Sequence, residues 1–145
     1  MRTPSTDRPL EIPFREEDGE LWVDGVRLSE IAARHGTPVY VTAEGRVRDN
    51  ARRFRRAFEA VWPRFEPLFA VKSNSNPAIL SIVRSEGFGA DCASPGEVAL
   101  ARSAGIPRES IVATVPYPSS RDLDLLHRQV GRHPGHRLHE AVEFR

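Results

Sequence analysis

An alternation of short apolar runs and amphipathic segments, between residues 67 and 126, most restricts how this chain can fold. The apolar runs predict buried strands, and the segments that follow them predict helices. Strands separated by single helices require right-handed crossovers and therefore a parallel sheet. The predicted strands are 67–72, 88–92 and 110–114, and the predicted helices are 77–86, 95–104 and a third from Ser119 or Ser120 to Leu126.

This alternation predicts an α/β fold. The pattern could continue as a parallel (β/α)₈ barrel, of which the chain holds only the first strands and helices, or as an open doubly wound sheet. In both architectures ligands bind at the carboxyl ends of the strands. Lys72, Asp91 and Thr114 end successive predicted strands, so we expect these side chains at one edge of the sheet.

The chain before residue 67 shows a hairpin signal followed by helical patterns. Asp24-Gly25 lies between two short apolar runs, which is a strong indication of a two-residue hairpin turn. Ser29 is expected to cap a short helix that ends at Gly36. The remaining predicted elements are a strand at 38–41 and an amphipathic helix at 44–62, closed by Pro63, with its arginines on the solvated face.

The patterns divide the chain into three parts. Residues 1–18 predict a flexible leader, residues 19–126 contain the regular elements, and residues 127–145 predict an irregular tail. Because the pattern stops after His127, we expect a truncated or frameshifted gene. The tail also contains three evenly spaced histidines, but a proline and a glycine between them prevent a helix, so no metal site is expected. They are His133, His136 and His139.

Composition argues against several classes of function. The 21 Lys and Arg residues and 20 Asp and Glu residues leave a net charge of +1, which argues against a nucleic-acid partner. No apolar run approaches the roughly 18 residues that cross a bilayer, and the start of the chain lacks a hydrophobic signal core. The single cysteine, Cys92, cannot form an internal disulfide. We therefore expect a cytoplasmic protein without a membrane partner.

Lysine is the most informative residue type in the chain, because Lys72 is the only lysine among 21 basic residues. Arginine is always protonated, whereas a desolvated lysine amine can lose its proton and form an imine. Four apolar residues precede Lys72, so the end of a buried strand is expected to desolvate the amine. The pattern indicates an imine-forming lysine, and a lone surface lysine is the alternative.

The residues around Lys72 resemble a known family. The segment Phe69-Ala-Val-Lys-Ser-Asn74 is similar to the motif of the cofactor lysine in the fold type III pyridoxal-phosphate-dependent decarboxylases of ornithine, arginine and diaminopimelate. Downstream, Gly89-Ala-Asp-Cys-Ala-Ser-Pro-Gly-Glu97 looks like the family's second-strand motif. Upstream, Gly36-Thr-Pro-Val-Tyr-Val41 resembles the opening of the diaminopimelate decarboxylases.

The resemblance implies a pyridoxal 5′-phosphate enzyme with an alanine-racemase-like barrel. By this resemblance Lys72 would be catalytic and would hold the cofactor as an imine, and Asp91 and Glu97 would bind close to the cofactor. The alternatives are a solvated strand-end acid for Asp91 and, for Glu97, a helix N-terminal acid stabilised by the helix dipole. The resemblance also implies an amino-acid substrate, and a homodimer in the full-length members of the family.

Two departures from the family pattern bear on activity. The third predicted strand leads into Thr114-Val-Pro-Tyr-Pro-Ser119, where relatives usually have a glycine-containing turn. Relatives are also much longer, and their phosphate loop lies beyond the residues of this chain. We therefore expect an amino-terminal fragment of a diaminopimelate-type decarboxylase that is inactive alone. The alternatives are a non-catalytic pyridoxal-phosphate-binding barrel protein and an inert fragment.

Overall fold

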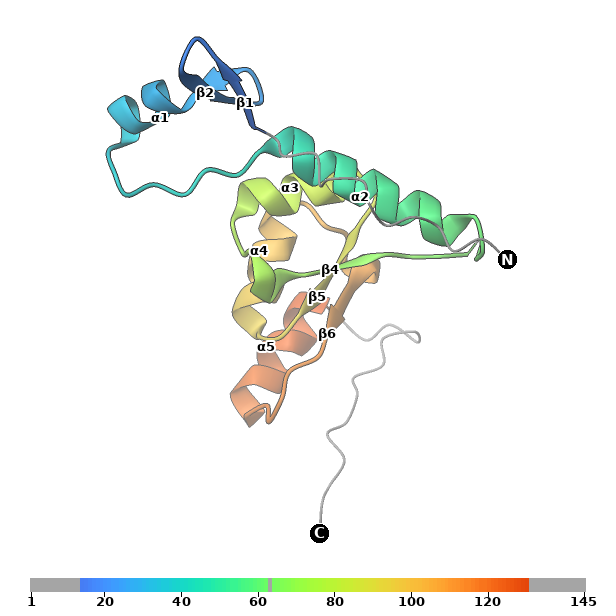
Figure 1. Cartoon of the computed structure of the whole chain (residues 1–145). Coiled ribbons are helices and arrows are strands. Elements are labelled where there is room, and N and C mark those ends of the chain that lie inside the picture. The colour runs from blue at the N-terminus through green and yellow to red at the C-terminus, as the bar shows by residue number, and fades with distance from the viewer. Residues whose placement is uncertain (1–13, 63, 131–145) are drawn as a thin grey trace. The chain divides into compact units, whose positions relative to one another are not determined.

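The computed structural model describes residues 14–62 and 64–130. The chain consists of two compact units, residues 1–49 and residues 50–145, each with most of its contacts between its own residues. Each unit contains one three-stranded sheet, and helix α2 (Glu44–Glu59) runs from the first unit into the second (Figure 1). Among the described residues, no helix has both the length and the apolar character that crossing a membrane requires.

The first unit begins with an antiparallel meander of three strands. Asp18-Gly19 and Asp24-Gly25 form its two turns, and all four residues have positive φ, as type I′ hairpin turns require. The second hairpin confirms the prediction from Asp24-Gly25. The first hairpin contains a strand inside the segment 1–18, where we had expected a flexible leader, and Asp18-Gly19 is the signal that could have indicated it. The strands are β1 (Phe14–Glu17), β2 (Glu20–Val23) and β3 (Val26–Arg27).

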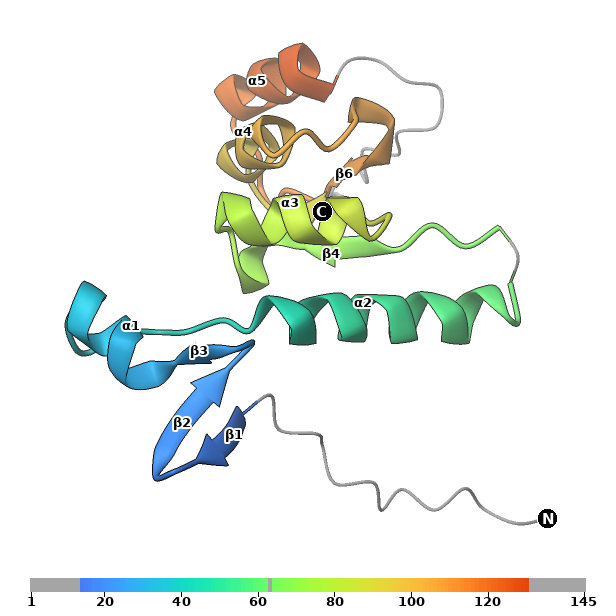
Figure 2. The same ribbon diagram turned by 90° about the horizontal axis from the view of Figure 1, so that it is seen from above.

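Helix α1 (Leu28–His35) follows β3 directly (Figure 2). The prediction that Ser29 caps this helix is wrong. The helix starts at Leu28, one residue before Ser29, and Arg27 is the N-cap residue. Instead, Ser29 Oγ donates a hydrogen bond to Glu20 Oε2 at 2.7 Å, so it ties the helix to strand β2. Gly36 ends the helix with a φ of 79°, as predicted.

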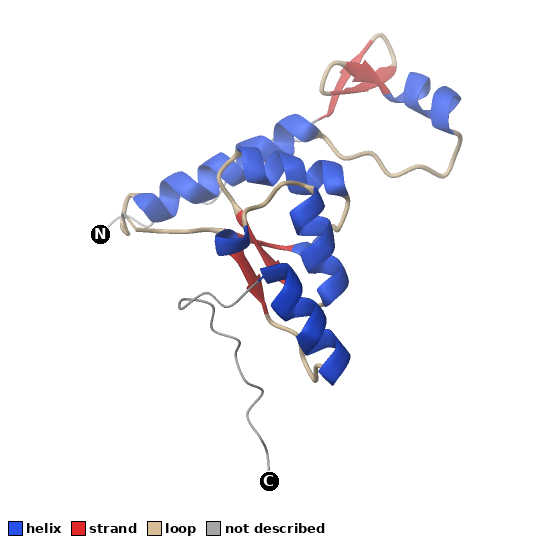
Figure 3. Cartoon of the chain, turned by 180° about the vertical axis from the view of Figure 1, so that it is seen from behind, coloured by secondary structure: helices blue, strands red, loops and turns tan. Residues whose placement is uncertain are grey.

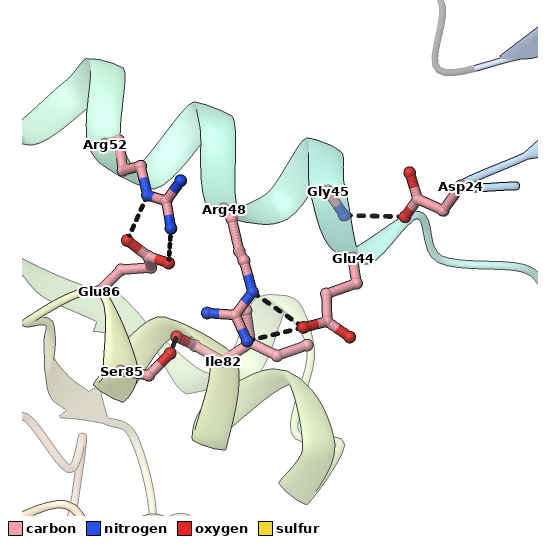
Figure 4. A network of polar contacts seen from close by, with 8 residues as sticks. All are labelled: Asp24, Glu44, Gly45, Arg48, Arg52, Ile82, Ser85 and Glu86. Carbon is pink, nitrogen blue, oxygen red and sulfur yellow. Dashed lines mark hydrogen bonds and ion pairs between the residues drawn. The ribbon is translucent and has the colours of Figure 1, made fainter.

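Residues 38–41, between α1 and α2, are irregular, so the predicted strand there is wrong. An apolar run forms a strand only where a neighbouring strand accepts its backbone hydrogen bonds, and neither sheet of the described residues does so. The N-terminus of α2 is tied to the meander instead. Gly45 N–H donates to Asp24 Oδ2 at 2.8 Å, which satisfies one of the free amide groups of a helix start (Figure 4).

The second unit is a parallel sheet with helices along one face (Figures 1 and 3). The strand order is β4-β5-β6, and β5 pairs in parallel with both neighbours, which confirms the predicted parallel α/β arrangement. The elements are β4 (Leu68–Ala70), the 3-10 turn η1 (Val71–Ser73), α3 (Pro77–Ser85), β5 (Gly89–Cys92), α4 (Pro95–Ser103), η2 (Arg108–Ser110), β6 (Ile111–Ala113) and α5 (Ser120–Val130).

The core of the second unit lies between the sheet and helices α3, α4 and α5. Side chains alternate along a strand, so Ala90 and Ile111 face the helices while their neighbours Asp91 and Val112 face the other side. On that other face, Leu68, Ala70, Asp91 and Val112 are not buried, and Leu68 is 39% exposed. The core consists of Val71, Leu80, Ala90, Cys92, Val98, Ala101, Ala104, Ile106, Ile111 and Leu126.

Arg52, Arg53 and Arg56 of α2 are exposed, as the sequence predicted, and two arginines of the helix also bind the end of α3. Arg52 Nε and Nη2 donate to the two carboxylate oxygens of Glu86 at 2.8 and 2.9 Å (Figure 4). Arg55 Nη1 donates to the Glu86 carbonyl oxygen at 2.9 Å. The Glu86 side chain is only 9% exposed, whereas its partner Arg52 is 55% exposed, so solvent still screens this ion pair from one side. Helix α2 also ends at Glu59 rather than at the predicted Trp62.

The apolar side of α2 contributes an aromatic cluster to the second unit. The Phe54 ring centroid lies 4.7, 5.8 and 6.0 Å from those of Phe58, Phe65 and Phe88. Phe58 also stacks on Phe65 at 4.8 Å. Phe54 and Phe58 belong to the apolar side that the periodicity predicted. They pack against Phe65 in the loop before β4 and Phe88 just before β5.

Strand β5 requires a glycine at its first position. A Cβ atom at Gly89 would overlap the backbone carbonyl oxygen of Ser110 and would lie 2.7 Å from Leu68 Cδ2. The Ser110 oxygen belongs to the backbone and cannot rotate away. The approach of β6 to β5 therefore depends on the missing side chain.

We predict that Gly89→Ala lowers the free energy of unfolding by about 1–3 kcal/mol, because the added methyl group overpacks the sheet. Urea unfolding of the whole chain measures this change. The matched control is Gly96→Ala in α4, where the nearest atom, Ser94 Oγ, is 3.7 Å from the added Cβ. The control is expected to leave stability unchanged or to raise it by up to about 1 kcal/mol. Equal unfolding midpoints for the two variants would contradict the packing argument.

Candidate active site

Lys72 lies just beyond the carboxyl end of β4, in the turn η1. Its neighbour Val71 is fully buried in the core and anchors the turn. Two hydrogen bonds close the turn: Ser73 Oγ donates to the Ala70 carbonyl at 2.7 Å, and Asn74 N–H donates to the Val71 carbonyl at 3.1 Å. The lysine is therefore carried by a well-ordered piece of backbone at the edge of the sheet.

The expected burial of Lys72 at the end of a strand is wrong. The strand ends at Ala70, and Lys72 is exposed. The apolar run before the lysine does not form one strand. Its first residues form β4, an outer strand of the sheet, and its last residue, Val71, belongs to the turn η1 and packs into the core. The exposed amine is accessible to a ligand from solvent.

Asp91 and Thr114 meet at the same edge of the sheet, as the sequence predicted. Asp91 pairs in register with Ala70 of β4 and with Val112 of β6, which places it on the face away from the helices. Thr114 Oγ1 donates a hydrogen bond to Asp91 Oδ1 at 3.2 Å. Lys72 follows Ala70 by two residues, so the lysine and the aspartate lie at the carboxyl ends of adjacent strands.

Glu97 lies in the first turn of α4 and makes the contacts of a helix cap. Its Oε2 accepts the Ala93 N–H at 2.7 Å, and its own N–H donates to Ser94 Oγ at 3.2 Å. This reciprocal pair closely resembles a capping box, with Ser94 as the N-cap residue. The second role that the resemblance implied for Glu97, toward a cofactor, stays a prediction.

Cys92 is fully buried at the end of β5. Burial, together with the negative charges of Glu97 and Asp91, raises the pKa of its thiol from 9.0 to about 12. Because the thiolate is the reactive form, a thiol with this pKa is inert near neutral pH. The structure therefore gives Cys92 a packing role, beside two acids of the candidate site.

A cavity of about 270 Å³ lies at the other end of the parallel sheet, near the amino ends of the strands. Its lining includes Arg55, Leu68, Gly89 and Val112. The candidate residues at the carboxyl edge do not line it. No group of three or more His, Cys, Asp or Glu residues in the described ranges could hold a metal ion. The three tail histidines at 133, 136 and 139 lie outside those ranges.

Comparison with known proteins identifies a family that matches this arrangement. Residues 44–132, more than half of the chain, match the family model described as "Pyridoxal-dependent decarboxylase, pyridoxal binding domain". A curated diaminopimelate decarboxylase from Methanothermobacter thermautotrophicus is 41% identical over 98 residues, which are 68% of this chain and 23% of the relative. One from Zymomonas mobilis is 44% identical over 102 residues, which are 70% of this chain and 24% of the relative.

Solved structures agree with the sequence comparisons. A crystal structure of diaminopimelate decarboxylase from M. jannaschii matches with a TM-score of 0.73 and 29% identity, over 79% of this chain and 27% of that one. The α/β arrangement of the chain is therefore that of a known fold. The chain spans about a quarter of the length of the curated relatives it matches.

We predict that the Cys92 thiol of the folded chain reacts with iodoacetamide at pH 8 about three orders of magnitude more slowly than in urea, because its pKa rises from 9.0 to about 12.

The same shift in the pKa of Cys92 makes the free energy of unfolding depend on pH. The folded pKa lies above the unfolded one, so this contribution is complete below pH 9 and is lost as the pH rises toward 12. Cys92→Ala is the control that lacks both effects. Alkylation of the native chain at the unfolded rate would contradict the buried environment.

We predict that Glu97→Gln lowers the free energy of unfolding by less than about 1 kcal/mol, because glutamine keeps an oxygen that accepts the Ala93 N–H. Ser94→Ala removes the cap oxygen and is expected to cost about 1 kcal/mol. Pyridoxal phosphate titrations of both variants then separate the two roles of Glu97. Unchanged affinity in Glu97→Gln would show that the residue only caps the helix.

Proposed function

We propose a function for this chain on the premise that it belongs to the pyridoxal-dependent decarboxylase family, whose pyridoxal-binding domain its residues 44–132 match. The chain is the cofactor-binding part of a diaminopimelate decarboxylase-like enzyme, and Lys72 is the residue that attaches pyridoxal 5′-phosphate. The observation that carries this proposal is the exposed Lys72, the only lysine in the sequence, at the carboxyl edge of a parallel sheet.

The residues at this edge fit the cofactor. Lys72 supplies an exposed primary amine, which can condense with an aldehyde and release one water. Asp91 supplies a carboxylate on the next strand, oriented by the hydrogen bond from Thr114. Glu97 adds a second carboxylate from the start of α4. When bound, pyridoxal phosphate supplies an electron sink for the carbanion that loss of carbon dioxide creates.

The substrate proposal rests on the relatives. The curated relatives named above are diaminopimelate decarboxylases, which supports an amino-acid substrate of that type and favours a decarboxylase over a non-catalytic carrier of the cofactor. A homodimer for a full-length relative and a cytoplasmic location are expectations of the same kind. The boundary of the barrel part, residues 19–126, also stays a prediction.

We further propose that β4, β5 and β6 are the first strands of a parallel (β/α)₈ barrel. The sheet face away from the helices supports this, because its residues Leu68, Ala70, Asp91 and Val112 are not buried. In a barrel this face is packed by side chains from the remaining strands. We therefore expect the 145 residues alone to release no carbon dioxide from diaminopimelate.

The attachment of pyridoxal phosphate is tested by incubation with the cofactor, borohydride reduction and peptide mapping. We predict that the pyridoxyl group is found on the peptide that contains Lys72. Lys72→Arg keeps the positive charge but loses the label and the absorbance of the bound cofactor, because a guanidinium does not form this bond.

Two controls make the attachment test specific. Arg108→Lys introduces a second exposed amine in η2, at the other edge of the sheet, and is expected to stay unlabelled at position 108. The terminal amine of Met1 is the other competitor. Labelling of position 108 as readily as Lys72, or recovery of the label only on Met1, would contradict the proposed function.

A further inference from the structure

The loop between β6 and α5, residues 114–119, is fixed at both ends. At its start, the Thr114 side chain binds Asp91. At its end, Ser119 caps α5: Ser119 Oγ accepts the Asp122 N–H at 3.2 Å, and Asp122 Oδ2 accepts from the Ser119 Oγ–H and N–H at 2.7 and 3.0 Å. The hydrogen bonds from Ser119 lower the pKa of Asp122, which keeps this cap charged. Hydrogen bonds therefore hold the loop at Thr114, where it leaves β6, and at Ser119, where α5 begins.

Tyr117, within this loop, has an unfavourable backbone conformation. Its φ is 52°, in the left-handed region that aromatic residues seldom adopt. The other non-glycine residues with positive φ in the described ranges are Asp18 and Asp24, and both belong to Asp-Gly hairpin turns that require it. Pro116 and Pro118 flank the tyrosine, and their rings restrict the conformations open to the loop.

Nothing within the described residues compensates this strain. The Tyr117 side chain is 93% exposed. Its hydroxyl group has no hydrogen-bond partner there, and its ring contacts no other aromatic ring. Strained residues are common at active sites and ligand clamps, and the loop that carries Tyr117 begins at Thr114, which binds Asp91 of the candidate site.

The loop leaves the sheet at the same edge as Lys72. Lys72 follows β4, Asp91 lies on the central strand β5, and the loop follows β6. Two spacings between adjacent strands amount to about 10 Å, the distance that separates β4 from β6. A ligand that is attached to Lys72 and extends past Asp91 therefore reaches the loop that carries Tyr117.

We propose that Tyr117 is a ligand-contacting residue, whose ring packs against the pyridoxal group held at Lys72. This inference rests on the proposed function, because it needs attachment at Lys72. The two prolines and the fixed ends of the loop restrict the backbone that carries the ring, so little backbone freedom is lost when the contact forms. The loop sequence Thr114-Val-Pro-Tyr-Pro-Ser119, which departs from the family pattern, thereby acquires a role.

Chemical nitration of tyrosine tests the contact without any measurement of activity. The chain is labelled with pyridoxal phosphate, reduced with borohydride and treated with tetranitromethane, and peptide mapping then compares labelled and unlabelled chains. The chain contains an internal control, because Tyr40 is fully exposed as well. We expect the label to protect Tyr117 and to leave the nitration of Tyr40 unchanged.

The outcomes of this experiment are distinguishable. Attachment at Lys72 with equal nitration of Tyr117 in both samples would overturn the contact and leave the proposed function intact. Failure of the label to attach at Lys72 would overturn the proposed function, and the contact with it. Protection of both tyrosines would indicate a general change in the chain and would also overturn a specific contact.

Binding measurements distinguish the ring from the hydroxyl group. Tyr117→Ala is expected to raise the pyridoxal phosphate concentration for half-maximal attachment by roughly threefold to tenfold, the range of a contact between two aromatic rings. Tyr117→Phe keeps the ring and is expected to bind as the unchanged chain does, as is the matched control Tyr40→Ala. Equal weakening in Tyr117→Phe and Tyr117→Ala, or no weakening in Tyr117→Ala, would overturn the ring contact.

Discussion

The pairing of β5 with a strand on each side is the constraint on which the second unit depends. The strand consists of small residues, and Gly89 admits the Ser110 carbonyl oxygen where any side chain would block it. The resulting register turns Ala90 toward the helices and Asp91 toward the opposite face. A slip of one residue would exchange these two faces, which would bury the acid and expose the alanine. Core packing and the position of the site acid are therefore specified together.

The same sheet explains why the candidate site can hold a ligand but does not enclose it. Lys72 and the loop with Tyr117 follow the two outer strands, and both residues are exposed. Catalysis by an amine-bound cofactor also requires a fixed orientation and the exclusion of water. In the proposed site, the residues described here would supply the attachment point and an aromatic ring, next to a carboxylate that is hydrogen-bonded to Thr114. In the proposed barrel, further strands would enclose the site, and the chain spans about a quarter of the length of the curated relatives it matches.

Local sequence patterns predicted the elements whose signals are short-range. Asp24-Gly25 forms its hairpin, and the helices predicted from residues 77 and 95 begin at Pro77 and Pro95. The predictions that failed depend on distant partners. Residues 38–41 are not a strand because no strand lies beside them in the described sheets, and Ser29 binds Glu20 of β2 instead of capping its own helix. Arg52, Arg53 and Arg56 of α2 are exposed, as predicted, but the sequence did not indicate that Arg52 and Arg55 bind Glu86, because Glu86 is more than 30 residues away.

The sequence by itself determined the parallel α/β arrangement and restricted the proposed attachment to one side chain, because alternating periodicity and a single lysine are visible without a structure. It also indicated that Asp91 and Thr114 share an edge, since parallel strands end together. Only the tertiary structure decided that Lys72 is exposed and that Glu97 caps its helix. Only the backbone showed the strain at Tyr117. The physical reason is that exposure and hydrogen-bond partners depend on which strands are outermost and which residues meet across the fold, and no local pattern encodes either.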